Sequence, residues 1–218
     1  MKVQAVIWDL DGTLLNTLDD LAASTNAALE AGGLPQRTTD EVRSFVGNGI
    51  HKLIERAMPQ PGAEHPKFQQ VLDAFVAHYG EHSKDRTQPY DGVMEVLDVL
   101  AARGVRHAIV SNKVDFAVKA LSREYFGDRM VSSVGDDPSR SKKPAPDSVW
   151  EAMRQMGVTA QEAVYVGDSQ VDVLTARNAG IPCIAVTWGF RSEACLLEAG
   201  AQYIARKPEE IIQIVEKL

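Results

Sequence analysis

Residues 3–13 read VQAVIWDLDGT, a mostly apolar run that ends in two carboxylates, Asp9 and Asp11, followed by Gly12. Other apolar runs rich in Val, Ile and Ala recur along the chain, and helical patterns follow them. Apolar runs that do not alternate with polar residues are typical of strands buried on both faces, as in a parallel sheet between two helix layers. The pattern therefore predicts an α/β protein with a doubly wound, Rossmann-like parallel sheet. The predicted strands are residues 3–8, 106–110, 130–134, 163–166 and 182–186.

The first connection between strands is much longer than the others. Residues 9–91 contain no convincing strand, whereas the crossover between parallel strands needs little more than one helix. Apolar side chains at helical spacing predict four helices inside this segment. We therefore expect a helical domain, residues 15–88, inserted into an α/β core formed by residues 1–14 and 89–218. The stripes that predict its helices lie within residues 18–29, 42–46, 50–57 and 68–79.

The amino-acid composition indicates which binding partners and which cellular compartment to expect. The 218 residues carry a formal net charge of −7, which opposes binding to nucleic acids and to anionic membranes. No apolar run is long enough for a membrane span, and the amino-terminal run is too short for a signal peptide. Cys183 and Cys195 lack the spacing of a zinc site or a disulfide framework. These features predict a reduced, cytoplasmic protein, either a monomer or a homodimer, with no nucleic-acid or membrane partner.

Polar side chains cluster in the sequence just after the predicted strands. In an open parallel sheet, ligands bind beyond the carboxyl ends of the strands, so these side chains are expected to converge. A cluster of carboxylate oxygens suits Mg²⁺ rather than zinc. The convergent set is Asp9, Asp11, Ser111, Lys143, Asp168 and Asp172.

Each of these elements taken alone has an ordinary structural explanation. The Asp-x-Asp-Gly segment is equally compatible with a turn, and Lys143 before a proline is compatible with a loop. Ser111 and Asn112 are typical of a helix cap; we expect Ser111 to open a helix whose free amides form an anion site. Their occurrence together at several strand ends favours a functional site.

In order and spacing, these elements resemble the four signature motifs of the haloacid dehalogenase superfamily of phosphohydrolases. The motifs correspond to residues 9–13, Ser111, Lys143 and residues 167–172. The helical insert resembles the cap of the subgroup that contains phosphoglycolate phosphatase and β-phosphoglucomutase. Asn16-Thr17 departs from the Asp-Ser that relatives often carry, which leaves the substrate preference open. Further strings similar to bacterial phosphoglycolate phosphatases are residues 45–49, 111–113, 135–147 and 187–190.

The resemblance implies a Mg²⁺-dependent phosphatase for a small phosphorylated metabolite, with 2-phosphoglycolate as the first candidate. It implies that Asp9 is the nucleophile that forms an aspartyl phosphate and that Asp11 is the general acid and base. Lys143 would stabilise the transferring phosphoryl group. The expected metal ligands are Asp9, Asp11 through its backbone carbonyl, Asp168 and, directly or as an orienting group, Asp172. The expected phosphate-binding residues are Thr13, Ser111 and Asn112.

The helical insert also contains candidate substrate-binding residues. Gly47, Asn48 and Gly49 stand at a helix start, where backbone amides could bind a substrate carboxylate. A simple tight turn explains the same glycines equally well. Basic side chains nearby are weaker candidates because charged side chains on helices are usually solvated. They are Arg43, Lys52 and Arg56.

Several alternative functions use the same residues. A β-phosphoglucomutase-like enzyme would return the phosphoryl group to a sugar rather than to water, and an inorganic pyrophosphatase would accept a compact substrate. A haloacid dehalogenase is disfavoured because Asp11 would have no role in releasing halide. A non-catalytic regulatory module would have lost the nucleophile or a metal ligand, and neither has been lost.

Overall fold

The computed structural model describes residues 3–218; residues 1 and 2 of the predicted core segment 1–14 lie outside this range. Contacts along the chain define two compact units. Asn16–Gln88 form one unit, and the other combines the chain up to Leu15 with Pro89–Leu218. Each unit is described separately.

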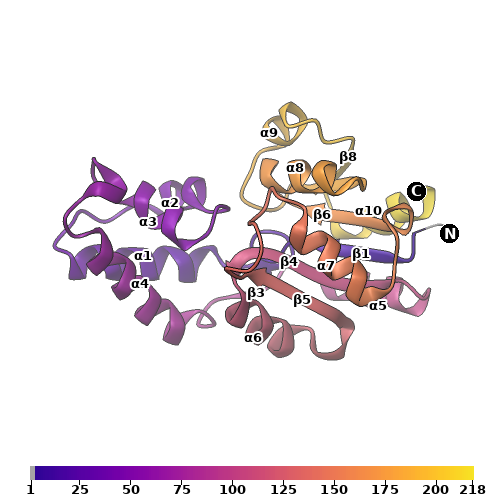
Figure 1. The fold of residues 1–218 in the computed structure, drawn as a ribbon, viewed down its shortest axis with the longest axis horizontal. Coiled ribbons are helices and arrows are strands. Elements are labelled where there is room, and N and C mark those ends of the chain that lie inside the picture. Colours follow the sequence, from indigo (N-terminus) through magenta and orange to yellow (C-terminus); the bar gives the residue numbers. More distant parts are fainter. Residues whose placement is uncertain (1–2) are drawn as a thin grey trace. The chain divides into compact units, whose positions relative to one another are not determined.

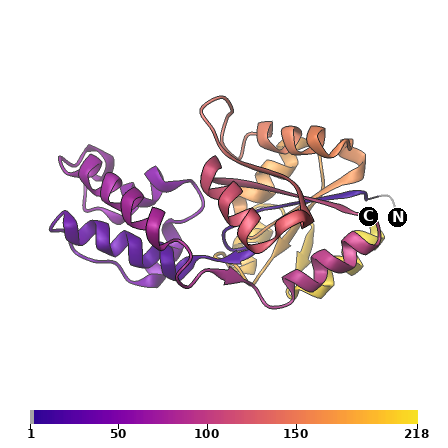
Figure 2. The same cartoon turned by 90° about the horizontal axis from the view of Figure 1, so that it is seen from below.

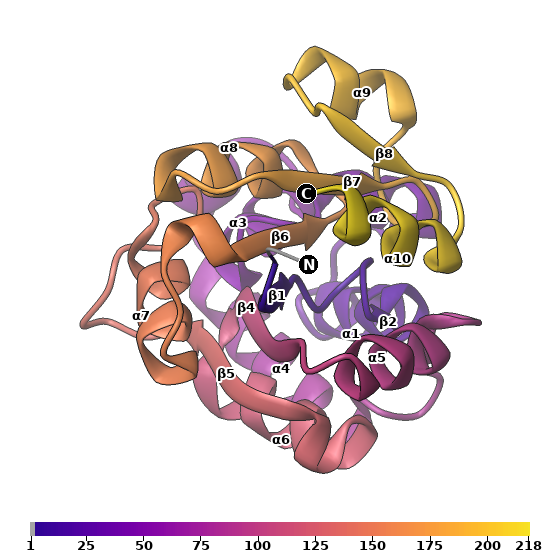
Figure 3. The same ribbon diagram turned by 90° about the vertical axis from the view of Figure 1, so that its right-hand side faces the viewer.

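The larger unit is built on a six-stranded, fully parallel sheet (Figure 1). Its strand order is β5-β4-β1-β6-β7-β8 (Figure 3). The predicted α/β fold with a parallel sheet is confirmed. The predicted strands are all present, and β8, which was not predicted, extends the sheet at one edge. Their bounds are β1 Ala5–Trp8, β4 Arg106–Val114, β5 Met130–Asp136, β6 Ala163–Gly167, β7 Cys183–Val186 and β8 Tyr203–Ala205.

Helices cover both faces of this sheet (Figure 3). On one face pack α5 (Val93–Ala102), α6 (Asp115–Tyr125) and α10 (Pro208–Lys217). On the other pack α7 (Asp147–Met156), α8 (Gln170–Ala179) and α9 (Glu193–Glu198). Strand β1 contributes alternate residues to the two cores, since Val6 and Trp8 face one and Ala5 and Ile7 face the other. Burial on both faces explains why its sequence is continuously apolar.

The smaller unit is helical. Its helices are α1 (Leu18–Ala31), α2 (Thr39–Phe45), α3 (Ile50–Ala57) and α4 (Phe68–His82), and α1 packs along α4 (Figure 2). The buried carboxylate of Asp20 in α1 accepts hydrogen bonds from the backbone amides of Arg86 and Thr87.

The remaining elements of the two units are short. They are the paired strands β2 (Leu15–Asn16) and β3 (Gln88–Pro89), and the 3₁₀ turns Gly62–Glu64, Gly127–Arg129 and Ala160–Glu162.

Strand β4 continues past the point where it was predicted to end. Val110 pairs with Val134 and Val114 pairs with Asp136, so three residues of β4 lie opposite the single residue Gly135. This irregularity is a bulge of residues 111–113, the kind of feature that re-aims side chains beside active sites. The prediction that Ser111 opens a helix is wrong, because Ser111 lies within β4 and α6 begins only at Asp115.

Among residues 3–218, no helix combines the length and the apolar character that crossing a membrane requires.

Candidate active site

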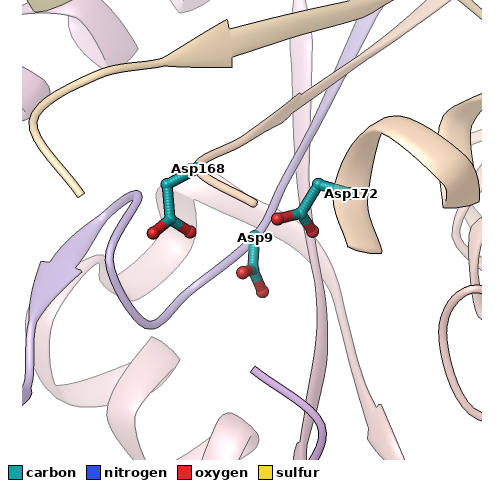
Figure 4. Close-up of side chains that lie close together, drawn as sticks. All are labelled: Asp9, Asp168 and Asp172. Atoms are coloured by element: carbon teal, nitrogen blue, oxygen red, sulfur yellow. The ribbon is translucent and has the colours of Figure 1, made fainter. Parts of the chain in front are cut away.

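The predicted site residues of the larger unit surround the carboxyl end of β1. From β1 the chain passes to β4 and β5 on one side, then to β6 and β7 on the other, so the strand order reverses around β1. Such a reversal opens a crevice beyond the carboxyl ends of the strands. Asp9 directly follows β1, Asp168 directly follows β6, and Asp172 lies in the first turn of α8. Figure 4 shows the three carboxylates facing a common space.

These three carboxylates form a tight, buried group. One oxygen from each of Asp9, Asp168 and Asp172 lies within 4.8 Å of the others. Burial, followed by the charge of Asp172, raises the pKa of Asp9 well above its usual value. The same two causes raise the pKa of Asp168 to about 7. Carboxylate oxygens are the ligands that a hard divalent ion such as Mg²⁺ prefers, so this group could hold such an ion.

Lys143 is the positive charge inside this group. Its Nζ lies 2.8 Å from Asp9 Oδ1 and 2.8 Å from Asp172 Oδ1, and it also donates to Tyr165 Oη at 3.1 Å. Burial disfavours the ammonium, but Asp172 and Asp9 outweigh that effect and hold the pKa of Lys143 well above its usual value. Lys143 is therefore a fixed cation beside Asp9.

Asp172 is already fully engaged by protein groups. Its Oδ1 accepts from Lys143 and from Tyr165, and its Oδ2 accepts from the backbone amide and the hydroxyl of Ser169 at 3.0 and 2.6 Å. A carboxylate with both oxygens in use acts best by orienting its neighbours. The geometry therefore favours the orienting role of Asp172 over direct metal ligation.

The loop after β7 holds Asp168 and the segment that follows β1. Asp168 Oδ2 accepts from the backbone amide of Phe190 at 2.6 Å, and its Oδ1 accepts from the Thr13 hydroxyl at 3.3 Å. The Trp188 indole donates to the Thr13 carbonyl at 3.1 Å. Gly12 has φ +87°, and a Cβ there would lie 2.5 Å from Asp168 Oδ2. Only glycine permits this backbone conformation at this approach.

Asp11 is turned toward a different partner. Its two carboxylate oxygens accept from Lys113 Nζ at 2.9 and 3.0 Å, and its side chain does not belong to the group of three carboxylates. A metal contact by Asp11 through its backbone carbonyl stays a prediction.

Ser111 and Asn112 lie in the β4 bulge and are nearly buried. The Ser111 hydroxyl accepts from the backbone amide of Lys113 at 3.2 Å, and the Asn112 amide donates to the carbonyl of Lys143 at 3.1 Å. Asn112 therefore helps to fix the loop that carries Lys143. Direct phosphate contacts by Thr13, Ser111 and Asn112 stay predictions.

Several candidate residues of the helical unit have partners within that unit. Gly47, Asn48 and Gly49 separate α2 from α3, and Asn48 Oδ1 accepts from Arg56 at 2.9 Å. Arg56 also donates to the carbonyl of Phe45, so its side chain contacts both the end of α2 and this turn. The two other basic candidates form surface ion pairs, Arg43 with Asp40 and Lys52 with Glu55.

Sequence reasoning missed three contributors to the site. Lys113 was noted only as part of a string, and its partner Asp11 lies 102 positions away. For Tyr165, the sequence indicates only a position in a predicted strand. The loop of residues 187–190 was noted only as a string similar to phosphoglycolate phosphatases, whereas in the structure it holds Asp168 and Thr13. Phe190 does so through a backbone amide, which leaves no side-chain signal in the sequence.

A doubly wound core with a lysine-paired carboxylate and an acidic group that could hold a metal ion, both at its strand ends, is a site suited to anionic substrates. The chain belongs to the haloacid dehalogenase-like hydrolase family, whose model matches residues 6–186. It is a phosphoric monoester hydrolase of this family, as predicted.

Individual relatives are similar over most of their length. A phosphoglycolate phosphatase of Thiobacillus denitrificans is 32% identical over 87% of this chain and 86% of its own. An N-acetylmuramic acid 6-phosphate phosphatase of Pseudomonas aeruginosa is 31% identical over 100% of this chain and 96% of its own. The crystal structure of a candidate phosphoglycolate phosphatase from Lactobacillus delbrueckii subsp. bulgaricus superposes with a TM-score of 0.94, at 32% identity over 99% of both chains.

Proposed function

We propose that this enzyme is a Mg²⁺-dependent phosphatase that hydrolyses a small phosphomonoester through an aspartyl phosphate, with 2-phosphoglycolate as its preferred substrate. The observation that carries the proposal is the placement of Asp9 at 2.8 Å from Lys143 within a buried group of carboxylates. Phosphatase relatives that cover most of the chain support the same reaction class.

In the first half-reaction, a carboxylate oxygen of Asp9 attacks phosphorus and the bond to the leaving oxygen breaks. Asp11 gives its proton to the departing alkoxide. Lys143 stays protonated and stabilises the phosphoryl oxygens as charge moves. Asp172 and Tyr165 hold Lys143 in place through the contacts described above.

In the second half-reaction, Asp11 takes a proton from water while the water oxygen attacks the phosphoaspartate. Inorganic phosphate leaves and the Asp9 carboxylate is restored. Mg²⁺ held by Asp9, Asp168 and the Asp11 carbonyl would neutralise negative charge around the phosphoryl group. Thr13, Ser111 and Asn112 are the residues that we propose bind its remaining oxygens.

We further propose that residues 15–88 act as a cap over a core made of residues 1–14 and 89–218. In this role the turn of Gly47, Asn48 and Gly49 would present backbone amides to the carboxylate of the substrate. Closure of such a cap would exclude bulk water during the first half-reaction and admit one water for the second.

The test is a panel of about a hundred phosphorylated metabolites, assayed with and without Mg²⁺ and ranked by kcat/KM. We expect 2-phosphoglycolate to rank first and all activity to require the metal. N-acetylmuramic acid 6-phosphate is the second candidate, because the relative named for it covers the whole chain. A ranking led by that sugar, by hexose phosphates or by pyrophosphate would refute the phosphoglycolate assignment.

The alternative of a phosphomutase has a separate test. A phosphatase transfers the phosphoryl group of its aspartyl phosphate to water, so incubation with a hexose 1-phosphate should yield inorganic phosphate. Conversion to the hexose 6-phosphate without release of inorganic phosphate would favour the mutase.

A further inference from the structure

Lys113 forms a nearly buried ion pair with Asp11. The side chain of Lys113 is 5% exposed and that of Asp11 is 15% exposed. Lys113 Nζ contacts the two carboxylate oxygens at almost equal distances, 2.9 and 3.0 Å. Two contacts to one carboxylate restrict its rotation far more than a single contact does.

The backbone of Lys113 is also held. Lys113 lies in the β4 bulge, and its amide donates to the hydroxyl of Ser111 at 3.2 Å. Gly135 faces the bulge from β5, and a Cβ on Gly135 would overlap the backbone of Asp115 and the carbonyl of Lys113. The bulge therefore aims a rigidly mounted ammonium at the Asp11 side chain.

A surface ion pair on α6 provides a contrast. Lys119 and Asp115 lie 2.6 Å apart, but the Lys119 side chain is 59% exposed. Exposed pairs of this kind contribute little, because water screens them and both side chains lose freedom in forming them. A buried lysine carries a desolvation cost that must be offset by its partner, so its position depends on that partner.

We infer that Lys113 is a positioning residue for the acid and base Asp11, and this inference rests on the proposed phosphatase function. Both carboxylate oxygens of Asp11 accept from Lys113 Nζ, so the ammonium fixes the orientation of the carboxylate. Lys113 thereby positions the Asp11 carboxylate for its proposed roles in both half-reactions.

The experiment compares two esters that differ in their need for an acid. The alkoxide of glycolate leaves poorly without a proton, whereas p-nitrophenolate leaves readily. In Lys113→Met, first-turnover release of glycolate from 2-phosphoglycolate should fall by roughly 10- to 100-fold, a part of the 10²- to 10⁴-fold that general acid catalysis contributes. First-turnover release of nitrophenolate from p-nitrophenyl phosphate should fall by less than about threefold, because that step makes little use of the acid.

Further variants separate positioning from a general loss of structure. In an Asp11→Asn background, adding Lys113→Met should change glycolate release by less than about twofold, because residues that act through one another are not additive. Lys113→Arg, which keeps a charged double donor, should recover part of the lost glycolate release. Lys119→Met is the matched control and should leave both esters unaffected. Urea unfolding of each variant reports whether the fold is retained.

Two results would overturn the inference alone: an equal loss for both esters in Lys113→Met, or full additivity with Asp11→Asn. If the unmodified protein releases neither leaving group in the presence of Mg²⁺, the proposed function falls and the inference falls with it.

Discussion

At the scale of single residues, Asp9 is held between one lysine and two further carboxylates. Lys143 lies 2.8 Å from its Oδ1, while Asp172 and Asp168 oppose its ionisation. In the proposed mechanism Asp9 attacks as a carboxylate, and the charge of Lys143 favours that ionised form. The contacts of Lys143 with Asp172 and Tyr165 keep the cation in place independently of Asp9.

Asp9→Asn is expected to abolish phosphatase activity while the fold is retained. An amide is a poor nucleophile, and removing a nucleophile from other hydrolases costs on the order of 10⁶-fold in turnover. Burial opposes the charge of Asp9, so the neutral amide should not lower the free energy of unfolding of the metal-free protein. Phosphate release assays and urea unfolding at pH 7.5 check the two parts. Turnover by a folded Asp9→Asn protein would contradict the covalent mechanism.

Mg²⁺ should stabilise the protein, and Asp168→Asn should remove that effect. A ligand that binds only the native state adds about 2.7 kcal/mol at a hundred times its Kd. Burial and the charge of Asp172 raise the pKa of Asp168 to about 7, so at lower pH the metal must displace a proton and its stabilising effect should shrink. Thermal unfolding with and without Mg²⁺ at pH 6 and pH 8 measures both effects. Asp128→Asn, a change at an exposed position, should behave like the unmodified protein.

At the scale of elements, the bulge in β4 sets where three site residues lie. Ser111, Asn112 and Lys113 occupy a segment that opposes a single residue of β5. A regular strand would alternate these side chains across the two faces of the sheet. The bulge instead lets Asn112 reach Lys143 and lets Lys113 reach Asp11.

Gly135→Ala should therefore damage both the fold and the site. A Cβ on Gly135 would overlap the backbone of Asp115, and overpacking of this kind costs about 1 to 3 kcal/mol. Gly80→Ala is the matched control: Gly80 lies inside α4, a Cβ there meets no neighbour, and the change should stabilise by about 0.5 to 1 kcal/mol. Urea unfolding and phosphatase assays of the two variants provide the test. A Gly135→Ala protein with unchanged stability and activity would show that the bulge tolerates a side chain.

The elements also show which parts of the structure a sequence can predict. Continuous apolar runs predicted five of the six core strands because burial on both faces leaves a strong pattern, whereas Tyr203–Ala205 is too short to leave one. Carboxylates after strand ends predicted the group around Asp9, since parallel strands end at a common edge. The pairing of Lys113 with Asp11 and the extension of β4 past Ser111 depend on a bulge, and bulges follow from pairing with a distant strand.

At the scale of the whole molecule, the buried side chain of His107 makes the stability of the core depend on pH. His107 Nδ1 accepts from the Trp8 indole at 3.2 Å, and its Nε2 lies 3.1 Å from the Leu97 carbonyl. Because Nδ1 accepts a hydrogen bond, this pattern requires the imidazole ring of His107 to be neutral. Burial lowers the pKa of His107 to about 4, although the Leu97 carbonyl opposes the shift.

Because the folded pKa lies below the ordinary value of 6.5, His107 contributes stability that is complete above pH 6.5 and is lost as pH falls toward 4. The full contribution is about 3 kcal/mol. His107→Gln keeps a donor and an acceptor but does not titrate. The difference in unfolding free energy between the unmodified protein and His107→Gln should shrink by about 2 to 3 kcal/mol between pH 7 and pH 4.5. Urea unfolding at both pH values measures it, and an unchanged difference would contradict the assignment.

The loop after β7 is synthesised later than the site residues that it holds. The Phe190 amide donates to Asp168, and the Trp188 indole donates to the Thr13 carbonyl. The ribosome makes Asp9 and Thr13 long before it makes this loop. Phe190 and Trp188 even lie past residue 186, where the match to the family model ends. A nascent chain that already contains Asp9 thus lacks the contacts that hold Asp168 and Thr13 until translation has passed Phe190. Fragments that end before this loop contain Asp9 without the contacts that hold Asp168 and Thr13, so we expect premature termination to yield chains that lack phosphatase activity.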